Sequence, residues 1–167
     1  SNKGKKRDLA LIVSEVPATV AGLFTTNQIC AAPVMVCIEH VKLGMAQAIV
    51  VNSGNANACT GRKGMEDARE MARVTADAVA FKLNSRTPRS ASQRERPRPG
   101  KLASLIPAKH ALVASTGRIG VPLPMTNVRR GIHAAAQLLE TSSENASQVA
   151  EAIMTSDTRP KQIAVEF

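Results

Sequence analysis

The residues whose types and spacing favour chemistry are Ser115, Thr116 and Gly117, which directly follow the short apolar run 111–114. A hydroxyl and a free backbone N–H can both donate hydrogen bonds to negative charge that develops during a reaction. Glycine also lets the backbone approach a ligand closely. The chain stays irregular after these residues, with two prolines, until a helical pattern begins at Met125. The alternative is a strand-to-helix connection without chemistry, because Gly and Pro mark turns more often than active sites.

Two other polar stretches are candidates for binding. Residues 155–158, Thr-Ser-Asp-Thr, could bind a polar substrate or could bond their own backbone as turn residues. The Asn- and Gly-rich residues 52–64 could cradle a phosphate before the next helix, but they match no established phosphate-loop motif, so a structural loop is the simpler interpretation. The histidines His40, His110 and His133 have no partner at metal-ligand spacing and are expected at the surface or at helix ends.

The pattern of apolar residues predicts an α/β protein. Apolar runs rich in β-branched residues predict strands, and apolar residues that recur every three or four positions predict helices. A turn is expected over 14–19, and a further apolar run covers 20–24. The predicted strands are 8–13, 33–38, 47–52, 111–114 and 161–167, and the predicted helices are 65–83, 125–139 and 143–154.

Composition limits the class of protein. The chain has 167 residues, of which 44% are hydrophobic and only 2% aromatic, so one domain with an aliphatic core is expected. The scarcity of aromatic rings argues against binding single-stranded nucleic acid by base stacking. No stretch is apolar for long enough to span a membrane. Three cysteines without C-x-x-C spacing predict neither a disulfide framework nor a zinc site, so a reducing, cytoplasmic location is expected.

The positive charge is concentrated in one segment. Six basic residues and one acidic residue lie between Asn84 and Lys101, so more than half of the net charge of +9 is local. This segment holds three prolines and almost no apolar residue, and it therefore cannot bury enough surface to fold. A disordered basic insertion is expected over 84–109. One alternative function is a basic nucleic-acid-binding module that uses this segment, although no specific nucleic-acid partner is expected.

Several motifs in a fixed order together resemble the ornithine acetyltransferase family, whose members are also called glutamate N-acetyltransferases. The resemblance covers nearly the whole chain except 84–109, and the set is specific although no single motif is. The motifs are Asp8-Leu-Ala-Leu-Ile, Ala21-Gly-Leu-Phe-Thr-Thr-Asn27, Ala32-Pro-Val, Val50-Val-Asn-Ser-Gly-Asn-Ala-Asn-Ala-Cys-Thr-Gly61, Ala114-Ser-Thr-Gly117 with Ile119-Gly-Val-Pro-Leu-Pro124, and Ala152-Ile-Met-Thr-Ser-Asp-Thr158 with Pro160-Lys161.

The resemblance implies a sheet-and-helix sandwich and an acyltransferase of arginine biosynthesis that moves acetyl from N-acetylornithine to glutamate through an acetyl-enzyme. It implies a precursor that cleaves itself before a Thr, which becomes the nucleophile at the N-terminus of a β chain and uses its own α-amino group as general base. The α and β chains are then expected to form a hetero-oligomer, in the cytoplasm or alternatively in a mitochondrial or plastid matrix. No cofactor and no metal are implied, and acetyl-CoA is a substrate of some members.

The resemblance also assigns roles to individual residues. Thr116 and Gly117 match the family's oxyanion-hole pair, and Thr155 matches a substrate-binding position. The segment that matches the family's nucleophile would follow Phe167. Residues 1–167 are therefore expected to form an incomplete α-chain domain that is inactive without its β chain.

The sequence departs from the family's pattern close to these positions. Arg118 stands where Val or Ile is usual, and Arg159 replaces a usual Phe. A long cation beside the oxyanion pair would either block the pocket or assist the anion. A non-catalytic remnant that keeps the fold without the activity is therefore the other alternative.

Overall fold

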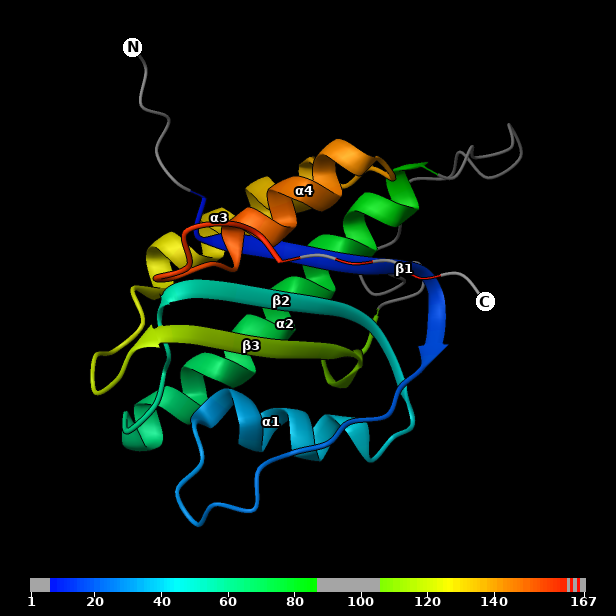
Figure 1. The fold of residues 1–167 in the computed structure, drawn as a ribbon. Coiled ribbons are helices and arrows are strands. Elements are labelled where there is room, and N and C mark those ends of the chain that lie inside the picture. The colour runs from blue at the N-terminus through cyan, green and yellow to red at the C-terminus, as the bar shows by residue number, and fades with distance from the viewer. Residues whose placement is uncertain (1–6, 87–105, 162, 164, 166–167) are drawn as a thin grey trace.

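A mixed sheet of three strands, in the order β1-β2-β3, lies at the centre of the computed structural model, which describes residues 7–86, 106–161, 163 and 165. Strand β1 (Leu9–Thr19) pairs antiparallel with β2 (Met45–Asn55), and β2 pairs in parallel with β3 (Ala111–Arg118). The strands predicted over 8–13, 47–52 and 111–114 are confirmed, and each is longer than predicted (Figure 1).

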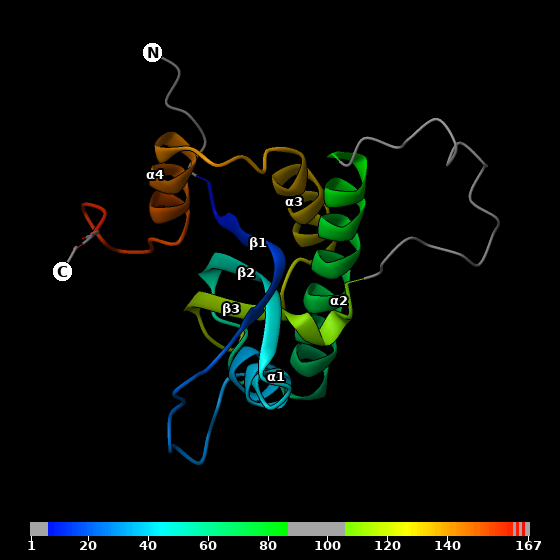
Figure 2. The same ribbon diagram turned by 90° about the vertical axis from the view of Figure 1, so that its right-hand side faces the viewer.

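The helices pack against different parts of this sheet. Helices α2 (Gly61–Arg86) and α3 (Met125–Gln137) cover one face together, and α4 (Ser143–Ala152) lies beyond β1 on the other side (Figure 2). Helix α1 (Ala32–Val41) runs along β3, which is entered through the short 3₁₀ turn η2 (Ala108–His110). The three predicted helices and the predicted α/β class are thus confirmed. Among the described residues, no helix combines the length and apolar character needed to cross a membrane.

The core lies between the sheet and α2. Val50 pairs with Leu11 on one side and Val113 on the other, so these three side chains share one face of the sheet and are buried together. Helix α2 presents mainly small side chains to this face, which lets helix and sheet pack closely. The fully buried side chains of α2 include Ala68, Met71, Ala72, Thr75, Ala76 and Val79.

The strand predicted over 33–38 is wrong, because these residues belong to helix α1. Its β-branched residues favoured a strand, but Pro33 occupies the start of the helix, where its fixed φ and missing N–H are tolerated. The buried residues Val36 and His40 lie four positions apart, which is the helical period. A short apolar run cannot be assigned to helix or strand from its periodicity alone.

The turn predicted over 14–19 is also wrong, because β1 continues to Thr19. Pairing with β2 is interrupted between Val13 and Ala18, and Pro17 lies in this irregular stretch. Proline is accepted there because it needs no ladder hydrogen bond at a bulge. The apolar run 20–24 forms neither helix nor strand.

Two sequence predictions lie largely outside the described residues. Of the basic insertion predicted over 84–109, residues 87–105 are not described, whereas Asn84 belongs to the last turn of α2 and Ile106 is buried in the core. Of the strand predicted over 161–167, residues 162, 164, 166 and 167 are not described. The described residues 161, 163 and 165 are in no strand.

Helix α1 covers part of the outer edge of β3 with two polar side chains. The Cys37 thiol lies 3.1 Å from the carbonyl oxygen of Val113 and 3.3 Å from its nitrogen, and burial raises the pKa of Cys37. His40 lies in the last turn of α1, which is one of the two positions expected for it, but it is buried, with Nδ1 2.9 Å from the carbonyl oxygen of Ala111. The two side chains occupy edge groups that would otherwise be unpaired.

Helices α2 and α3 are joined by an ion pair whose strength depends on pH. Arg129 donates from Nε to Oε1 of Glu70 over 2.8 Å, and this hydrogen bond lowers the pKa of Glu70. A carboxylate with a lowered pKa stabilises the fold above its unfolded pKa, and that stability is lost as the pH falls through the lowered value.

Glu70→Gln should therefore lower the free energy of unfolding at pH 7 by up to about 1 kcal/mol. The difference from the unmodified chain should shrink as the pH falls below roughly 4 and through the lowered pKa of the folded state, and it should vanish only where the carboxylate is protonated in both states. Urea unfolding at a series of pH values measures both effects. Asp77→Asn is the matched control, because among the described residues Asp77 pairs with Arg73 of its own helix α2 and not with α3. An equal loss for Glu70→Gln at pH 3 and pH 7 would contradict the assignment.

Candidate functional site

The predicted site residues lie where β2 and β3 end side by side. Because the two strands are parallel, their carboxyl ends meet at one edge of the sheet, and Thr116 pairs there with Ser53 and Gly117 with Gly54. Thr116 is half-buried, and Gly117 is exposed. The sequence predicts that this strand ends at Ala114. In the structure β3 continues to Arg118, so Thr116 and Gly117 are among its last residues paired with β2. Open α/β sheets commonly bind ligands at this edge.

Side chains alternate between the two faces of the sheet at this edge. Asn52 and Ser115 face the core side, where the Ser115 hydroxyl donates to Oδ1 of Asn52 over 2.6 Å. Ser53 and Thr116 are each one residue further along and so face the opposite side. The Thr116 hydroxyl is therefore directed away from α2.

Gly117 is required by the close approach of the two strands. Its φ is +132°, and a Cβ at this position would overlap the carbonyl carbon of Gly54 and lie 2.5 Å from the backbone nitrogen of Asn55. A side chain at residue 117 would thus push β3 away from β2. The glycine noted in the sequence is explained here by backbone geometry that other residues rarely adopt.

The segment that follows β3 is fastened to the end of β2 by three sets of hydrogen bonds. Ala56 donates its N–H to the carbonyl of Arg118 over 2.8 Å, and Gly120 donates to the carbonyl of Ala58 over 2.8 Å. Asn55 donates from Nδ2 to the carbonyls of Val121 and Pro122, over 3.0 and 3.2 Å. The irregular stretch 119–122 is therefore fixed in place.

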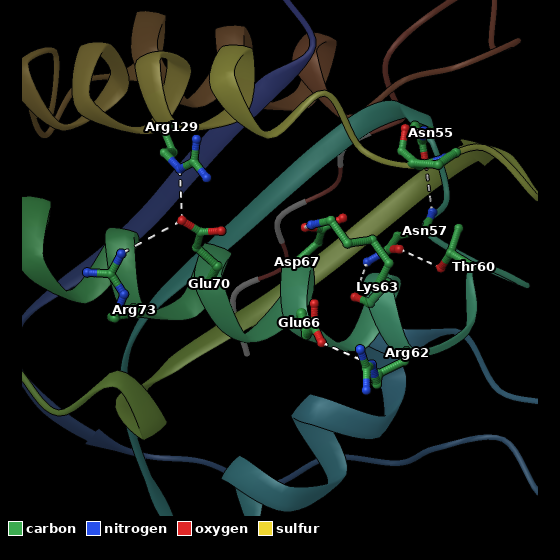
Figure 3. A network of polar contacts seen from close by, with 12 residues as sticks. Asn55, Asn57, Thr60, Arg62, Lys63, Glu66, Asp67, Glu70, Arg73 and Arg129 are labelled. Atoms are coloured by element: carbon green, nitrogen blue, oxygen red, sulfur yellow. Dashed lines mark hydrogen bonds and ion pairs between the residues drawn. The ribbon is translucent and has the colours of Figure 1, made fainter.

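Asn57 connects the end of β2 to the first turns of two helices (Figure 3). Its side chain is fully buried, donates from Nδ2 to the carbonyl of Gly64 over 2.9 Å, and accepts at Oδ1 from the Thr60 hydroxyl over 2.7 Å. Its backbone carbonyl accepts from the N–H of Ala32 at the start of α1. Its φ of +48° lies in the left-handed region that Asn tolerates better than most residues.

The N-terminal end of helix α1 lies beside the carboxyl ends of β2 and β3 (Figure 1). His40 contacts Ala111, Cys37 contacts Val113, and Ala32 contacts Asn57, so α1 runs antiparallel to β3. Figure 1 shows the N-terminal ends of α1 and α2 beside the carboxyl ends of β2 and β3. The positive end of the α1 dipole therefore lies near Thr116 and Gly117.

The charged side chains at the start of α2 are paired with one another. Lys63 binds Asp67 one turn further along, which raises the pKa of Lys63, and Arg62 pairs with Glu66 at 3.3 Å. These cations are therefore not presented to a phosphate, and the structural interpretation of residues 52–64 fits the observed bonds better. Of that stretch, 52–55 belong to β2 and only 56–60 form a loop.

Thr155 lies in the exposed turn that follows α4. The Ser53 hydroxyl donates to the carbonyl of Ala152, the last residue of α4, over 2.7 Å. Ser53 is also the strand partner of Thr116. The structure thus brings the turn that carries Thr155 to the edge that carries Thr116 and Gly117, through a residue that the sequence analysis did not single out.

Two charged residues lie next to these positions, Arg118 directly after Gly117 and Asp157 in the same turn as Thr155. Arg118 is exposed, and its carbonyl is engaged by Ala56. In the turn after α4, Lys161 binds Asp157, and this hydrogen bond lowers the pKa of Asp157. The described residues contain no group of three or more His, Cys, Asp or Glu side chains that could hold a metal ion.

Sequence reasoning missed Ser53, Asn55 and Asn57 as residues that build the site. The available signal was the density of Asn and Gly after a β-branched strand, since Asn side chains bond nearby backbone and Asn and Gly both accept positive φ. That signal indicates an ordered turn, but it does not say which carbonyls the side chains reach.

A family comparison decides the relationship. The ArgJ family model matches residues 1–167, which is the whole chain. The chain belongs to the ArgJ family. Two curated relatives, both named arginine biosynthesis bifunctional protein ArgJ, come from Caldanaerobacter subterraneus subsp. tengcongensis and Symbiobacterium thermophilum. They are 46% and 47% identical, each over 99% of this chain, and the chain spans about a third of their length, 34% and 35%.

Solved structures agree with this ArgJ-family assignment. An arginine biosynthesis bifunctional protein from Bacillus halodurans matches with a TM-score of 0.72 and 37% identity, over 94% of this chain and 69% of that one. An ornithine acetyltransferase from Mycobacterium tuberculosis, solved with ornithine, matches with a TM-score of 0.72 and 35% identity, over 93% and 70%. The fold predicted from the resemblance is thereby confirmed.

The role of Asn57 in this ArgJ-family chain can be tested by substitution. Asn57→Ala should lower the free energy of unfolding by about 2–4 kcal/mol, because buried partners lose their hydrogen bonds. Asn57→Gly should be less costly than Asn57→Ala, since glycine relieves the left-handed backbone. Urea unfolding gives both values. Cys59→Ala serves as control, because Cys59 also has a positive φ, +56°, but is exposed. Equal losses at residues 57 and 59 would refute the role of the Asn57 side chain.

The close approach at Gly117 makes a second prediction. Gly117→Ala should cost at least about 2 kcal/mol more than Gly120→Ala, because backbone atoms of β2 cannot move aside as a flexible side chain can. Gly120 also has a positive φ, +72°, but a Cβ there meets nothing within 4 Å, so only backbone strain is added. Chemical unfolding of both variants provides the comparison. Similar losses for the two would show that the strands separate easily at this edge.

Proposed function

We propose that this chain is the α-chain part of an acetyltransferase that moves acetyl from N-acetylornithine to glutamate in arginine biosynthesis. Membership of the ArgJ family supports the assignment, as do the names of the relatives and the ornithine in the M. tuberculosis structure. The observation that carries it is the placement of Thr116 and Gly117 at the carboxyl edge of parallel strands, beside the N-terminal end of α1.

Thr116 and Gly117 would act as the oxyanion hole. Attack on the acetyl carbonyl places negative charge on its oxygen, and the Thr116 hydroxyl and the Gly117 N–H would donate hydrogen bonds to that charge. The N–H of Val113 points to the side of β3 opposite β2, where it meets Cys37. Because the backbone N–H groups of every second strand residue point to the same side, the N–H of Gly117 is directed to that side as well. The nearby positive end of the α1 dipole adds favourable potential there.

The attacking group would come from another part of the enzyme. In this proposal a Thr at the N-terminus of a β chain, released by cleavage of the precursor, attacks the acetyl group and keeps it as an ester while ornithine leaves. Glutamate then takes the acetyl group from the ester. Thr155 would contact the substrate through its hydroxyl, and acetyl-CoA would be an additional acetyl donor rather than a cofactor.

The test uses the full-length protein in which this chain is completed by the segments that its relatives have. It should convert N-acetylornithine and glutamate to ornithine and N-acetylglutamate. Thr116→Ala should lower kcat by roughly 10²–10³, the usual effect of losing one oxyanion donor, with KM changed much less. Thr155→Ala should act mainly through KM, as expected for a contact made before and during the reaction.

Thr126→Ala is the control for this experiment, because Thr126 is an exposed residue in the first turn of α3. Full activity of Thr116→Ala would remove the oxyanion assignment. An inactive wild type would favour the alternative of a non-catalytic remnant. An inactive wild type that becomes active with Arg118→Val would instead show that the long cation blocks the pocket.

A further inference from the structure

Ser53 lies between the two halves of the proposed site. It pairs in register with Thr116 on β3, and its hydroxyl donates to the carbonyl of Ala152 at the end of α4 over 2.7 Å. Thr155 follows Ala152 by three residues. One half-buried hydroxyl therefore links a strand that carries an oxyanion candidate with a helix that leads to the substrate-binding candidate.

The hydrogen bond from Ser53 meets a specific need at the end of α4. The last four carbonyls of a helix have no partner within the helix. Ala152 is 1% exposed and is the buried residue of α4, so its carbonyl lies where water has little access. A carbonyl left without a donor in such a place costs free energy, and Ser53 supplies the donor.

The two ends of α4 are held independently. At its start, the Ser142 hydroxyl accepts from the N–H of Asn145 over 3.1 Å, which is an ordinary N-cap. At its end, the hydrogen bond to Ala152 comes from a different part of the chain, 99 residues away. Loss of the N-cap would loosen the helix, whereas loss of the Ser53 hydroxyl would remove the hydrogen bond between β2 and the end of α4.

We propose that Ser53 is a positioning residue of the acetyl-transfer site, which fixes the Thr155 turn relative to Thr116. The inference rests on the proposed function of these two residues. Ser53 faces the same side of the sheet as Thr116, whereas the neighbouring Ser115 is bonded to Asn52 on the core side. Ser53 itself takes no part in the chemistry and acts through the carbonyl of Ala152.

The experiment compares three variants of the completed, full-length protein. Ser53→Ala should raise KM for N-acetylornithine about fivefold to tenfold, the effect of one hydrogen bond, and should change kcat less than about threefold. Ser53→Thr keeps the hydroxyl and should restore KM to within about twofold of the wild-type value. Ser142→Ala is the matched control, since it weakens α4 at its other end and should leave KM unchanged.

Each outcome distinguishes this inference from the proposed function. An inactive wild type would overturn the proposed function and this inference with it. An active wild type whose KM does not respond to Ser53→Ala would overturn this inference alone. An equal rise in KM for Ser142→Ala would also overturn it, because general loosening of α4 would then suffice. If Ser53→Ala does not fold, Ser53→Val, which also lacks a donor and suits a strand, provides the same comparison, and a normal KM for it would overturn the inference.

Discussion

The buried side chain of Asn57 is the constraint on which this edge of the protein depends. It holds the Gly64 carbonyl in the first turn of α2 and the Thr60 hydroxyl before it, while its own carbonyl receives the N–H of Ala32 at the start of α1. The end of β2 and the beginnings of two helices are therefore set by one residue. A smaller side chain at position 57 would leave several buried polar groups without partners, which is more costly than losing exposed ones.

The hydrogen bond between Ala32 and Asn57 also sets the orientation of α1, and this orientation determines which backbone groups of β3 the helix covers. With its N-terminal end fixed at Asn57, α1 reaches back along β3, and His40 and Cys37 cover the edge groups of Ala111 and Val113. An unpaired strand edge is a liability in most proteins. Among the described residues, these hydrogen bonds from α1 side chains end at Val113 and do not reach Gly117.

Most helices and strands can be predicted from the sequence, because their apolar residues repeat at regular spacing over many positions. The pattern over 65–83 shows which face of α2 is buried, and the resemblance indicates the family. The prediction for 33–38 is wrong because three alternating β-branched residues outweigh the proline that begins a helix. The prediction for 14–19 is wrong because a proline can sit in a bulge within a paired strand. In both cases tertiary context overrides a local preference.

The arrangement of the site is less predictable, because it depends on which backbone carbonyls small polar side chains reach. Ser53, Asn55 and Asn57 alternate along the chain and bond the end of α4, the segment after β3 and the first turn of α2, respectively. The partners of Ser53 and Asn55 lie 99 and 66 residues away in the sequence, so no local pattern identifies them, whereas the partner of Asn57 lies seven residues further along. All three side chains come from β2 or from the residues directly after it. The positions of the end of α4, the segment after β3 and the start of α2 relative to one another therefore depend on β2. This explains why the stretch is rich in Asn, Ser and Gly without being a phosphate loop. Its side chains bind backbone next to Thr116, Gly117 and Thr155, the residues of the proposed site.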